Sequence, residues 1–176
     1  MRPWSSLLAA GRRALLAPMQ LSSRGTVHPA DVFGPQSLAL YLHFPFCASL
    51  CAYCVFNKKV PRRGELEAYV SALEREISFY GAWPQLKATP VGSMFLVGGT
   101  PSVLPADLLE QSLAAARRSF SLAPGAQITI EVNPESATAE KLSRYRAAGI
   151  NRVSIGVQSF DPALLEALGR PQRKKD

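Results

Sequence analysis

The chain has 176 residues, 47% of them hydrophobic, and a formal net charge of +7. This length is usual for one domain, and no apolar run approaches the roughly 20 residues of a membrane-spanning helix. The excess charge lies at the two ends, because four arginines precede the first acidic residue, Asp31, and residues 170–176 carry a net charge of +3. The neutral body shows no basic stripe that would follow a phosphate backbone. We therefore expect neither a membrane span nor a nucleic-acid partner.

Residues 1–37 have the composition of a mitochondrial transit peptide followed by a linker. They contain arginine and serine but no acid before Asp31, and pairs of leucines lie between basic residues. A secretory signal would need an unbroken apolar segment, which Arg12 and Arg13 interrupt. A disordered basic tail is the alternative. The transit-peptide interpretation predicts a mitochondrial location, and in either case we expect the folded core to begin at Leu38.

From residue 38 onward the hydrophobic pattern changes repeatedly between the period of a strand and that of a helix. Strands are predicted at residues 38–44, 93–99, 127–133 and 152–159. Helices are predicted at residues 66–80, 105–120, 138–149 and 161–169. Capping residues support the last two helices, because Thr138 and Asp161 are good N-cap residues, Pro162 fits a first turn and Gly149 suits a C-terminal end.

Strand and helix alternate four times, which predicts an α/β fold with a parallel sheet and covering helices. A polar or glycine-rich cluster follows each strand. Three cysteines follow the first, GGTPS follows the second, Glu131 and Asn133 lie at the end of the third, and Gln158 lies at the end of the fourth. The carboxyl ends of parallel strands share one edge, where such folds place their active sites. The four clusters are therefore expected to form one composite site.

The chain has three cysteines, Cys47, Cys51 and Cys54, and they lie within eight residues. A structural zinc site generally takes four ligands, so it would require His43 or a distant residue as well. An odd number of cysteines argues against a disulfide scaffold, and packing of inert thiols does not explain such a cluster beside Pro45. A 4Fe-4S cluster held by three thiolates leaves one iron free to bind a substrate or cofactor. The pattern therefore favours iron-sulfur chemistry.

The segment CASLCAYC has the form C-x3-C-x-aromatic-C and resembles the cluster motif of the radical S-adenosylmethionine (SAM) superfamily. The segments YLHFPFC, FLVGGTPS, IEVNPE, VSIGVQSF and LGR resemble the branch of oxygen-independent coproporphyrinogen oxidase and the HemW-type heme chaperone, in order and spacing. This resemblance runs from about Ala39 to Arg170. It implies a partial (β/α) barrel that holds a 4Fe-4S cluster on the three cysteines and binds SAM at the open iron.

The resemblance also implies which residues contact SAM. They are Tyr41 before the cluster ligands, Tyr53 between two of them, Gly98, Gly99 and Thr100 at the amino group, Glu131 at the ribose, and Gln158 and Arg170 at further positions of the site. Two of these roles also make physical sense without the family. Glycines let a ligand approach the backbone closely, and a carboxylate at a strand end suits the hydroxyls of a ribose.

Each of these residues also has a purely structural interpretation. Glu131 could be a capping acid or pair with Arg152, and Gln158 could bond the backbone at a sheet edge. The two tyrosines could be packing residues, and Arg170 could be an exposed cation at a helix end. We interpret His43 as a residue at the pocket edge rather than a ligand, and residues 58–63, KKVPRR, as a solvated basic loop.

The resemblance leaves a choice between a chaperone and an enzyme. In that family the decarboxylating oxidase has a further cysteine two residues after the third ligand, and this chain has Phe56 there. We therefore expect a mitochondrial heme chaperone, which binds heme, a cluster and SAM, receives electrons from a reducing donor, and delivers heme to apo-hemoproteins. An oxygen-independent coproporphyrinogen III oxidase is the alternative.

A third hypothesis is an inactive fragment. Members of this branch have six βα units and a further C-terminal domain, whereas four units are present here. We expect residues 38–170 to be a truncated radical SAM core and residues 171–176 to be a basic tail without a family counterpart. Val153, Ile155 and Val157 of the last strand would then lose a neighbour and be exposed.

Overall fold

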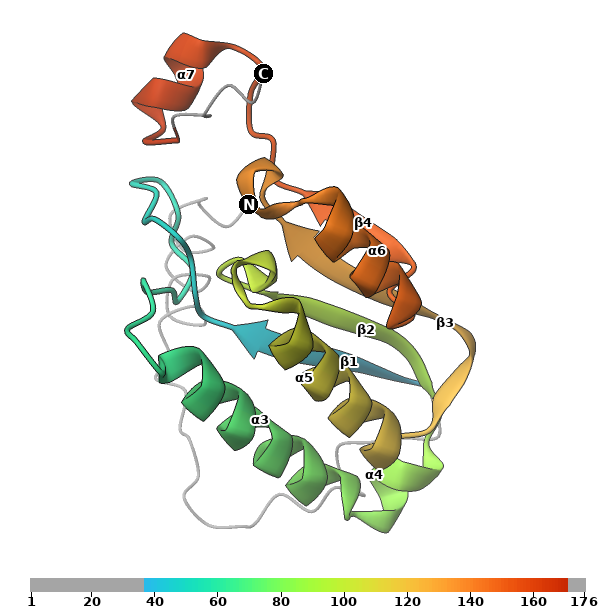
Figure 1. Cartoon of the computed structure of the whole chain (residues 1–176). Helices are drawn as coiled ribbons and strands as arrows, with labels where there is room; N and C mark the ends of the chain where they lie inside the picture. Colours follow the sequence, from blue (N-terminus) through green and yellow to red (C-terminus); the bar gives the residue numbers. More distant parts are fainter. Residues whose placement is uncertain (1–36, 171–176) are drawn as a thin grey trace, which may run out of the picture. The chain divides into compact units, whose positions relative to one another are not determined.

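The structure of the protein is a computed structural model that describes residues 37–170 (Figure 1). The predicted tail at residues 171–176, and the predicted transit peptide apart from its last residue, lie outside the described residues. None of the helices in the described part combines the length and the hydrophobicity that crossing a membrane requires.

The described residues contain one four-stranded sheet in which all neighbours are parallel. Its strands are β1 (Leu38–Phe44), β2 (Val91–Gly98), β3 (Leu122–Val132) and β4 (Arg152–Ile155), and they lie side by side in the order of the chain. Helical structure after each of the first three strands returns the chain to the start of the next strand. The prediction of an α/β fold with a parallel sheet is confirmed.

Three long helices cover one face of the sheet. They are α3 (Glu65–Gly81), α5 (Ala106–Ser119) and α6 (Ala139–Ala147). Figure 1 shows them side by side, with α5 between the other two. The shorter segments are α4 (Pro84–Ala88), α7 (Pro162–Ala167) and the 3-10 turns η1 (Pro101–Val103) and η2 (Pro134–Ser136). The sequence patterns did not predict α4, η1 or η2, because each is too short to show a helical period.

Local capping chemistry sets the ends of the last two helices as predicted. Thr138 Oγ1 accepts a hydrogen bond from a backbone N–H in the first turn of α6 (3.2 Å), and Asp161 Oδ1 does the same for α7 (2.8 Å). Gly149, which follows α6, has a φ of +89°. Pro105 is the N-cap of α5 and so lies one residue before the helix that it was expected to open.

The hydrophobic core lies between the sheet and these helices. Leu42, Leu96 and Ile130, from three neighbouring strands, are buried there, together with Leu109 and Leu113 of α5. Removing one such side chain from water stabilises the fold by roughly 1.5–3 kcal/mol. This burial determines which side of each strand faces the helices, and therefore which side is left for the site.

The side chains that alternate with these core residues along each strand point away from the helices. The register aligns Tyr41 with Phe95 and Glu131 with Ser154 on this second face. No helix of the described residues covers it (Figure 1). The second face therefore carries polar groups close to the carboxyl ends of the strands.

The fourth strand is shorter than predicted and ends at Ile155 rather than at residue 159. The extended backbone stops there, and Gln158 has a left-handed φ of +64°. Val153 and Ile155 are 40% and 52% exposed, in agreement with the expected exposure, whereas Val157 is half-buried.

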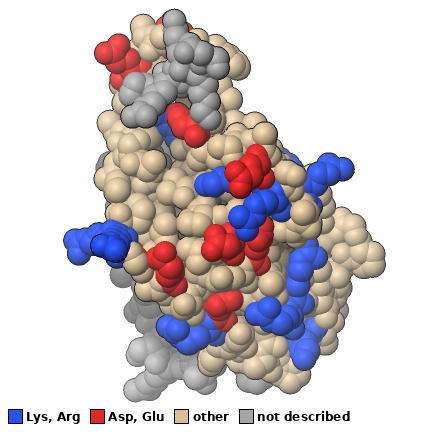
Figure 2. All heavy atoms as spheres, in the orientation of Figure 1, with Lys and Arg blue, Asp and Glu red and all other residues tan. Residues whose placement is uncertain are grey.

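The helix-covered face carries mixed charges. Figure 2 shows acidic and basic side chains interspersed over it. Two of them form a bidentate pair between α5 and α6, in which Arg144 Nε and Nη2 each donate to a carboxylate oxygen of Glu110 at 2.8 Å. Such a planar pair fixes the two helices relative to each other more firmly than a single contact would.

Candidate functional site

A cavity of about 340 Å³ lies at the carboxyl edge of the sheet. It is lined by residues that end or follow the four strands: Cys47, Cys51, Tyr53, Cys54, Phe56, Lys58, Gly98, Gly99, Thr100, Glu131, Val132, Asn133, Ser154, Ile155, Gly156, Gln158 and Arg170. The structure thus brings together the three cysteines and seven of the eight residues predicted to contact the cofactor. The eighth, Tyr41, does not line this cavity.

The cysteines lie on a loop of residues 47–58, here called the cluster loop, which is closed at its base. Cys47 N donates to Lys59 O (3.0 Å), and Lys59 N donates to Pro45 O (2.8 Å). These two bonds form a short parallel bridge between Phe46 and Lys59. The ends of the cluster loop are therefore held together although the loop has no regular secondary structure.

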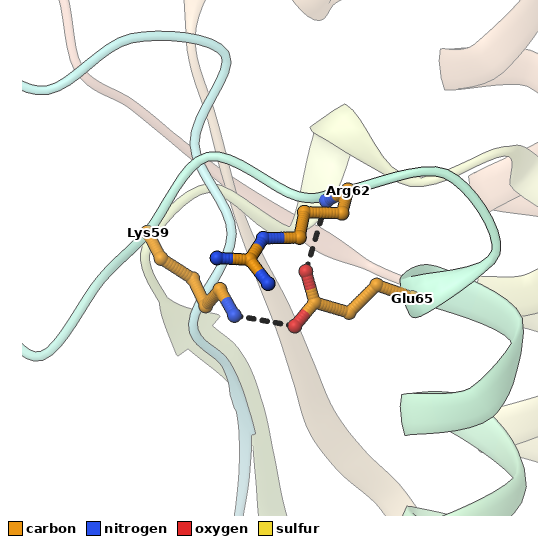
Figure 3. Close-up of polar contacts among 3 residues, drawn as sticks. All are labelled: Lys59, Arg62 and Glu65. Carbon is orange, nitrogen blue, oxygen red and sulfur yellow. Dashed lines mark hydrogen bonds and ion pairs between the residues drawn. The ribbon is translucent and has the colours of Figure 1, made fainter.

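Residues that follow the cluster loop connect it to the start of α3. Figure 3 shows the carboxylate of Glu65 between the ammonium of Lys59 and the backbone N–H of Arg62, which donates to it at 2.9 Å. The hydrogen bond from Lys59 lowers the pKa of the Glu65 carboxyl. Lys58 also donates a hydrogen bond to the carbonyl of Cys54. The segment 58–63 is therefore engaged with the loop and the helix, while Lys59, Val60, Arg62 and Arg63 remain exposed, as expected of a solvated basic loop.

Two glycines at the end of β2 let the cluster loop approach the sheet. A Cβ on Gly99 would lie 2.6–2.8 Å from backbone atoms of Phe46, and one on Gly98, whose φ is +122°, would lie 2.7 Å from the His43 ring. Gly99 N donates to Phe44 O (2.8 Å), and Thr100 N donates to Phe46 O (2.7 Å). The absence of side chains at these glycines therefore first of all lets the segment that leads into the cluster loop pack against the end of β2. Both glycines also line the cavity.

The three thiols have surroundings that suit thiolate ligands. Cys47 is buried, Cys51 and Cys54 are half-buried, and all three are free. Thr100 Oγ1 lies 3.6 Å from Cys47 Sγ, and Arg170 Nε donates to Cys51 Sγ (3.2 Å). Two of the three sulfurs thus have a hydrogen-bonding group beside them, as sulfur ligands of metal clusters commonly do.

The three thiols line one cavity. No three His, Cys, Asp or Glu side chains of residues 37–170 converge on one point, as the ligands of a single metal ion must. In a 4Fe-4S cluster each thiolate binds a different iron, so its ligands surround a larger volume. Three thiols around this cavity fit such a group.

Glu131 presents a carboxylate to the cavity. Partial burial raises the pKa of this carboxyl. Arg152, its expected structural partner, donates to Gln127 instead (3.4 Å). Among the ion pairs of the described residues, none includes Glu131. Its oxygens are therefore available to accept hydrogen bonds from hydroxyl groups of a ligand.

Arg170 joins three of the strand ends. In addition to its bond with Cys51, Nη1 donates to Gly156 O (2.8 Å) and Nη2 donates to Asn133 Oδ1 (3.0 Å). The residue is half-buried, so it differs from the exposed helix-end cation of the structural interpretation. It brings one permanent positive charge to the cavity wall.

Tyr53 and Gln158 line the same cavity. Desolvation raises the pKa of the Tyr53 hydroxyl, against the opposing effect of Arg170. Gln158 has a positive φ, as no other non-glycine residue of the described part does. This conformation costs about 1–2 kcal/mol, and residues that retain such strain are concentrated at functional sites.

Tyr41 and His43 lie on β1, next to the cavity but outside it. Their rings stack at 5.8 Å, and Tyr41 Oη and His43 Nδ1 are 3.2 Å apart. Tyr41 lines a smaller cavity of about 240 Å³, which shares Phe56, Gly98 and Glu131 with the larger one. The alternation of side chains along β1 places both rings on the second face.

Sequence reasoning gave no role to three residues that shape the site. Asn133 bonds both Thr100 and Arg170, and Lys58 bonds the cluster loop. Tyr69 of α3 donates to His43 O (2.6 Å) and packs edge-on against Phe46. Asn133 was visible as a polar residue at the end of the third strand, and Lys58 as part of the basic segment 58–63. Tyr69 gave no signal, because its role depends on a contact across 26 residues of sequence.

Comparison with known proteins points to one family. The profile of the Radical SAM superfamily matches residues 41–176. Radical S-adenosyl methionine domain-containing protein 1, mitochondrial, of Bos taurus is 37% identical over 143 residues, which cover 81% of this chain and 32% of that protein. Heme chaperone HemW of Synechocystis is 39% identical over 144 residues, which cover 78% and 34% of the two chains.

The oxidases of the same branch are equally similar. Oxygen-independent coproporphyrinogen III oxidase of Bradyrhizobium diazoefficiens is 37% identical over 143 residues, which cover 77% of this chain and 30% of that one. The solved structure of coproporphyrinogen III oxidase (HemN) from Escherichia coli superimposes with a TM-score of 0.73 at 34% identity, over 80% of this chain and 32% of that one. The chain thus spans about a third of the length of these relatives.

Proposed function

The chain belongs to the radical SAM superfamily, and from this premise we propose that it is a mitochondrial heme chaperone-like protein that binds a 4Fe-4S cluster, SAM and heme. The observation that carries the proposal is the cavity at the carboxyl edge of the sheet, where three free thiols meet Arg170 and Glu131. We further propose that the bound heme is delivered to apo-hemoproteins.

The residues present fit the cluster and SAM. Cys47, Cys51 and Cys54 would hold the cluster, which when bound supplies an iron without a protein ligand at which SAM can be bound and reduced. The loop around Gly99 would meet the amino group of SAM through its backbone. Glu131 would accept hydrogen bonds from the ribose hydroxyls, since its oxygens face the cavity. Tyr53, Gln158 and Arg170 would line the rest of that binding site, and Tyr41 would contact it only from the adjoining cavity.

One side chain favours a chaperone over an oxidase. Phe56 occupies the position at which the resemblance places a further cysteine in the decarboxylating enzymes. Its ring lines the cavity and is 67% exposed. An exposed aromatic ring offers a flat apolar surface to a planar ligand such as a porphyrin.

The functional test compares heme transfer with oxidase activity. The anaerobically purified full chain, loaded with iron and sulfide, is titrated with heme and then mixed with an apo-hemoprotein such as apomyoglobin. We expect a saturable change in the heme absorption spectrum, passage of heme to the acceptor, and no decarboxylation of coproporphyrinogen III with SAM and a reductant. Sustained decarboxylation would instead identify an oxidase. The Cys47→Ser variant shows whether heme binding depends on the cluster.

The location is proposed from residues 1–37 and from the name of the Bos taurus relative. We expect residues 1–37 fused to a fluorescent protein to accumulate in mitochondria. Replacing Arg12 and Arg13 by glutamate should abolish the import, because transit peptides need a basic, acid-poor segment. A cytosolic distribution of the unmodified fusion would contradict the proposal.

A further inference from the structure

A chain of hydrogen bonds connects two of the three cysteines across the cavity. Arg170 Nε donates to Cys51 Sγ (3.2 Å), and its Nη2 donates to Asn133 Oδ1 (3.0 Å). Asn133 Nδ2 lies 3.2 Å from Thr100 Oγ1, which is itself 3.6 Å from Cys47 Sγ. Asn133 therefore contacts both of the groups that face the thiols.

The chemistry of these groups fixes the direction of every bond except that between Thr100 and Cys47, where the hydroxyl must donate once Cys47 is a thiolate ligand. A guanidinium has only donors, so the Asn133 atom that faces Arg170 must be its carbonyl oxygen. The amide NH₂ then faces Thr100 and must donate to Oγ1. Because Oγ1 accepts this bond, the hydroxyl hydrogen of Thr100 is free to point at Cys47 Sγ. One amide side chain thus directs an O–H donor to one thiol and an N–H donor to another.

The backbone of Asn133 is held by two hydrogen bonds, and a neighbouring strand end lies against its side chain. Its own backbone N–H donates to Ser102 Oγ (3.4 Å), and Ser136 Oγ donates to its carbonyl (3.1 Å). A Cβ placed on Gly156 would lie 3.2 Å from Asn133 Oδ1, so the neighbouring strand end packs closely against the amide. Such restraint is what a group needs in order to orient others.

We propose that Asn133 is a positioning residue that orients Thr100 and Arg170 as hydrogen-bond donors to two cluster ligands and so raises the reduction potential of the cluster. This inference rests on the proposed cluster binding. Hydrogen bonds to ligand sulfurs stabilise the reduced cluster, which is the more negatively charged form, and they shift its potential upward. Asn133 touches neither thiol and acts only through its two partners.

The test measures the midpoint potential of the reconstituted cluster in the full chain by an EPR-monitored redox titration. The variants are Asn133→Ala, Thr100→Val and the double substitution, with Thr100→Ser as the control that keeps the hydroxyl. Iron and sulfide per chain are measured in parallel. This comparison separates a change in potential from a loss of cluster.

We expect Asn133→Ala and Thr100→Val each to shift the potential to more negative values, and Thr100→Ser to keep the wild-type potential. The double variant should shift by less than the sum of the single shifts, because one residue acts through the other. A fully loaded Asn133→Ala variant with the wild-type potential, or strictly additive shifts, would overturn the inference. If Asn133→Ala does not fold, a wild-type potential in the Thr100→Val variant would overturn the inference instead. A wild-type chain that takes up no cluster would overturn the proposed function, and with it this inference.

Discussion

Replacing Gly99 by alanine should weaken the fold and the cluster site together. A Cβ at this position would lie 2.6, 2.7 and 2.8 Å from the O, N and C atoms of Phe46. These are backbone atoms at the start of the cluster loop, so no side chain can rotate away to make room. To restore a contact of 3.4 Å, the loop must move by about 0.6–0.8 Å.

That movement acts against two short backbone hydrogen bonds, Gly99 N to Phe44 O at 2.8 Å and Thr100 N to Phe46 O at 2.7 Å. Overpacking at a well-packed position costs about 1–3 kcal/mol, and the loss of one such bond adds roughly 0.5–1.5 kcal/mol. We therefore expect the free energy of unfolding to fall by about 2–4 kcal/mol, which is a large part of the ~5–15 kcal/mol typical of a domain.

The assay is urea unfolding of the cluster-free full chain followed by circular dichroism, with iron per chain after reconstitution as a second readout. Gly92→Ala in the same strand is the matched control, because its Cβ would meet only Ser37 at an ordinary 3.5 Å. The control should be neutral or slightly stabilising. A Gly99→Ala unfolding free energy within about 0.5 kcal/mol of that of Gly92→Ala would refute the reasoning.

Three further substitutions test other parts of the site. Glu131→Gln should weaken SAM binding about 10- to 100-fold in anaerobic calorimetry, because a hydrogen bond to a charged acceptor contributes about 1.5–3 kcal/mol; an unchanged Kd would exclude the ribose contact. Burial raises the pKa of Glu131, so wild-type stability should fall as pH rises from 4.5 through the folded-state pKa, and the Gln variant should lack this slope. The pKa of Glu65 is lowered, mainly by the hydrogen bond from Lys59. The ionised Glu65 carboxylate therefore contributes to the stability of the fold above pH 4.5, and this contribution is lost as pH falls through the folded-state pKa. Glu65→Gln should flatten that part of the acid-unfolding curve, and superimposable curves would exclude the contribution. Lys141 Nζ donates to two backbone carbonyls near η1, at 2.7 and 3.0 Å. Lys141→Met removes this donor and should lower the free energy of unfolding in urea by about 1–3 kcal/mol. A change below about 0.5 kcal/mol would show that water replaces the ammonium.

The alternation of hydrophobic periods predicted both the sheet and the place of the site. The strand period identified β1 to β4, and their parallel order brought the cysteines, GGTPS, Glu131 and Gln158 to one edge. Each of these inferences depends on local patterns together with one rule about where parallel strands end. Short features were not predicted, because the five residues of α4 show no period and the apolar pattern of residues 152–159 continues past the end of β4 at Ile155.

The contacts within the site were not predictable in the same way. Asn133 lies 33 residues from Thr100 and 37 from Arg170, and its role depends on the relative position of three strand ends. Tyr41 was assigned by its place in a motif, whereas the register of β1 places it in the adjoining cavity. Motif spacing gives the ligands on one loop, but side-chain partners from different loops appear only in the folded chain.

The central claim is that three thiolates of this chain hold a 4Fe-4S cluster with an iron open to SAM. It is tested most directly by anaerobic reconstitution of the full chain with iron and sulfide, with both quantified, and by the EPR spectrum of the reduced protein before and after SAM is added. The account predicts about four irons per chain and a spectrum that changes on addition of SAM. Uptake of zinc in place of a cluster, or a cluster whose spectrum does not respond to SAM, would contradict it.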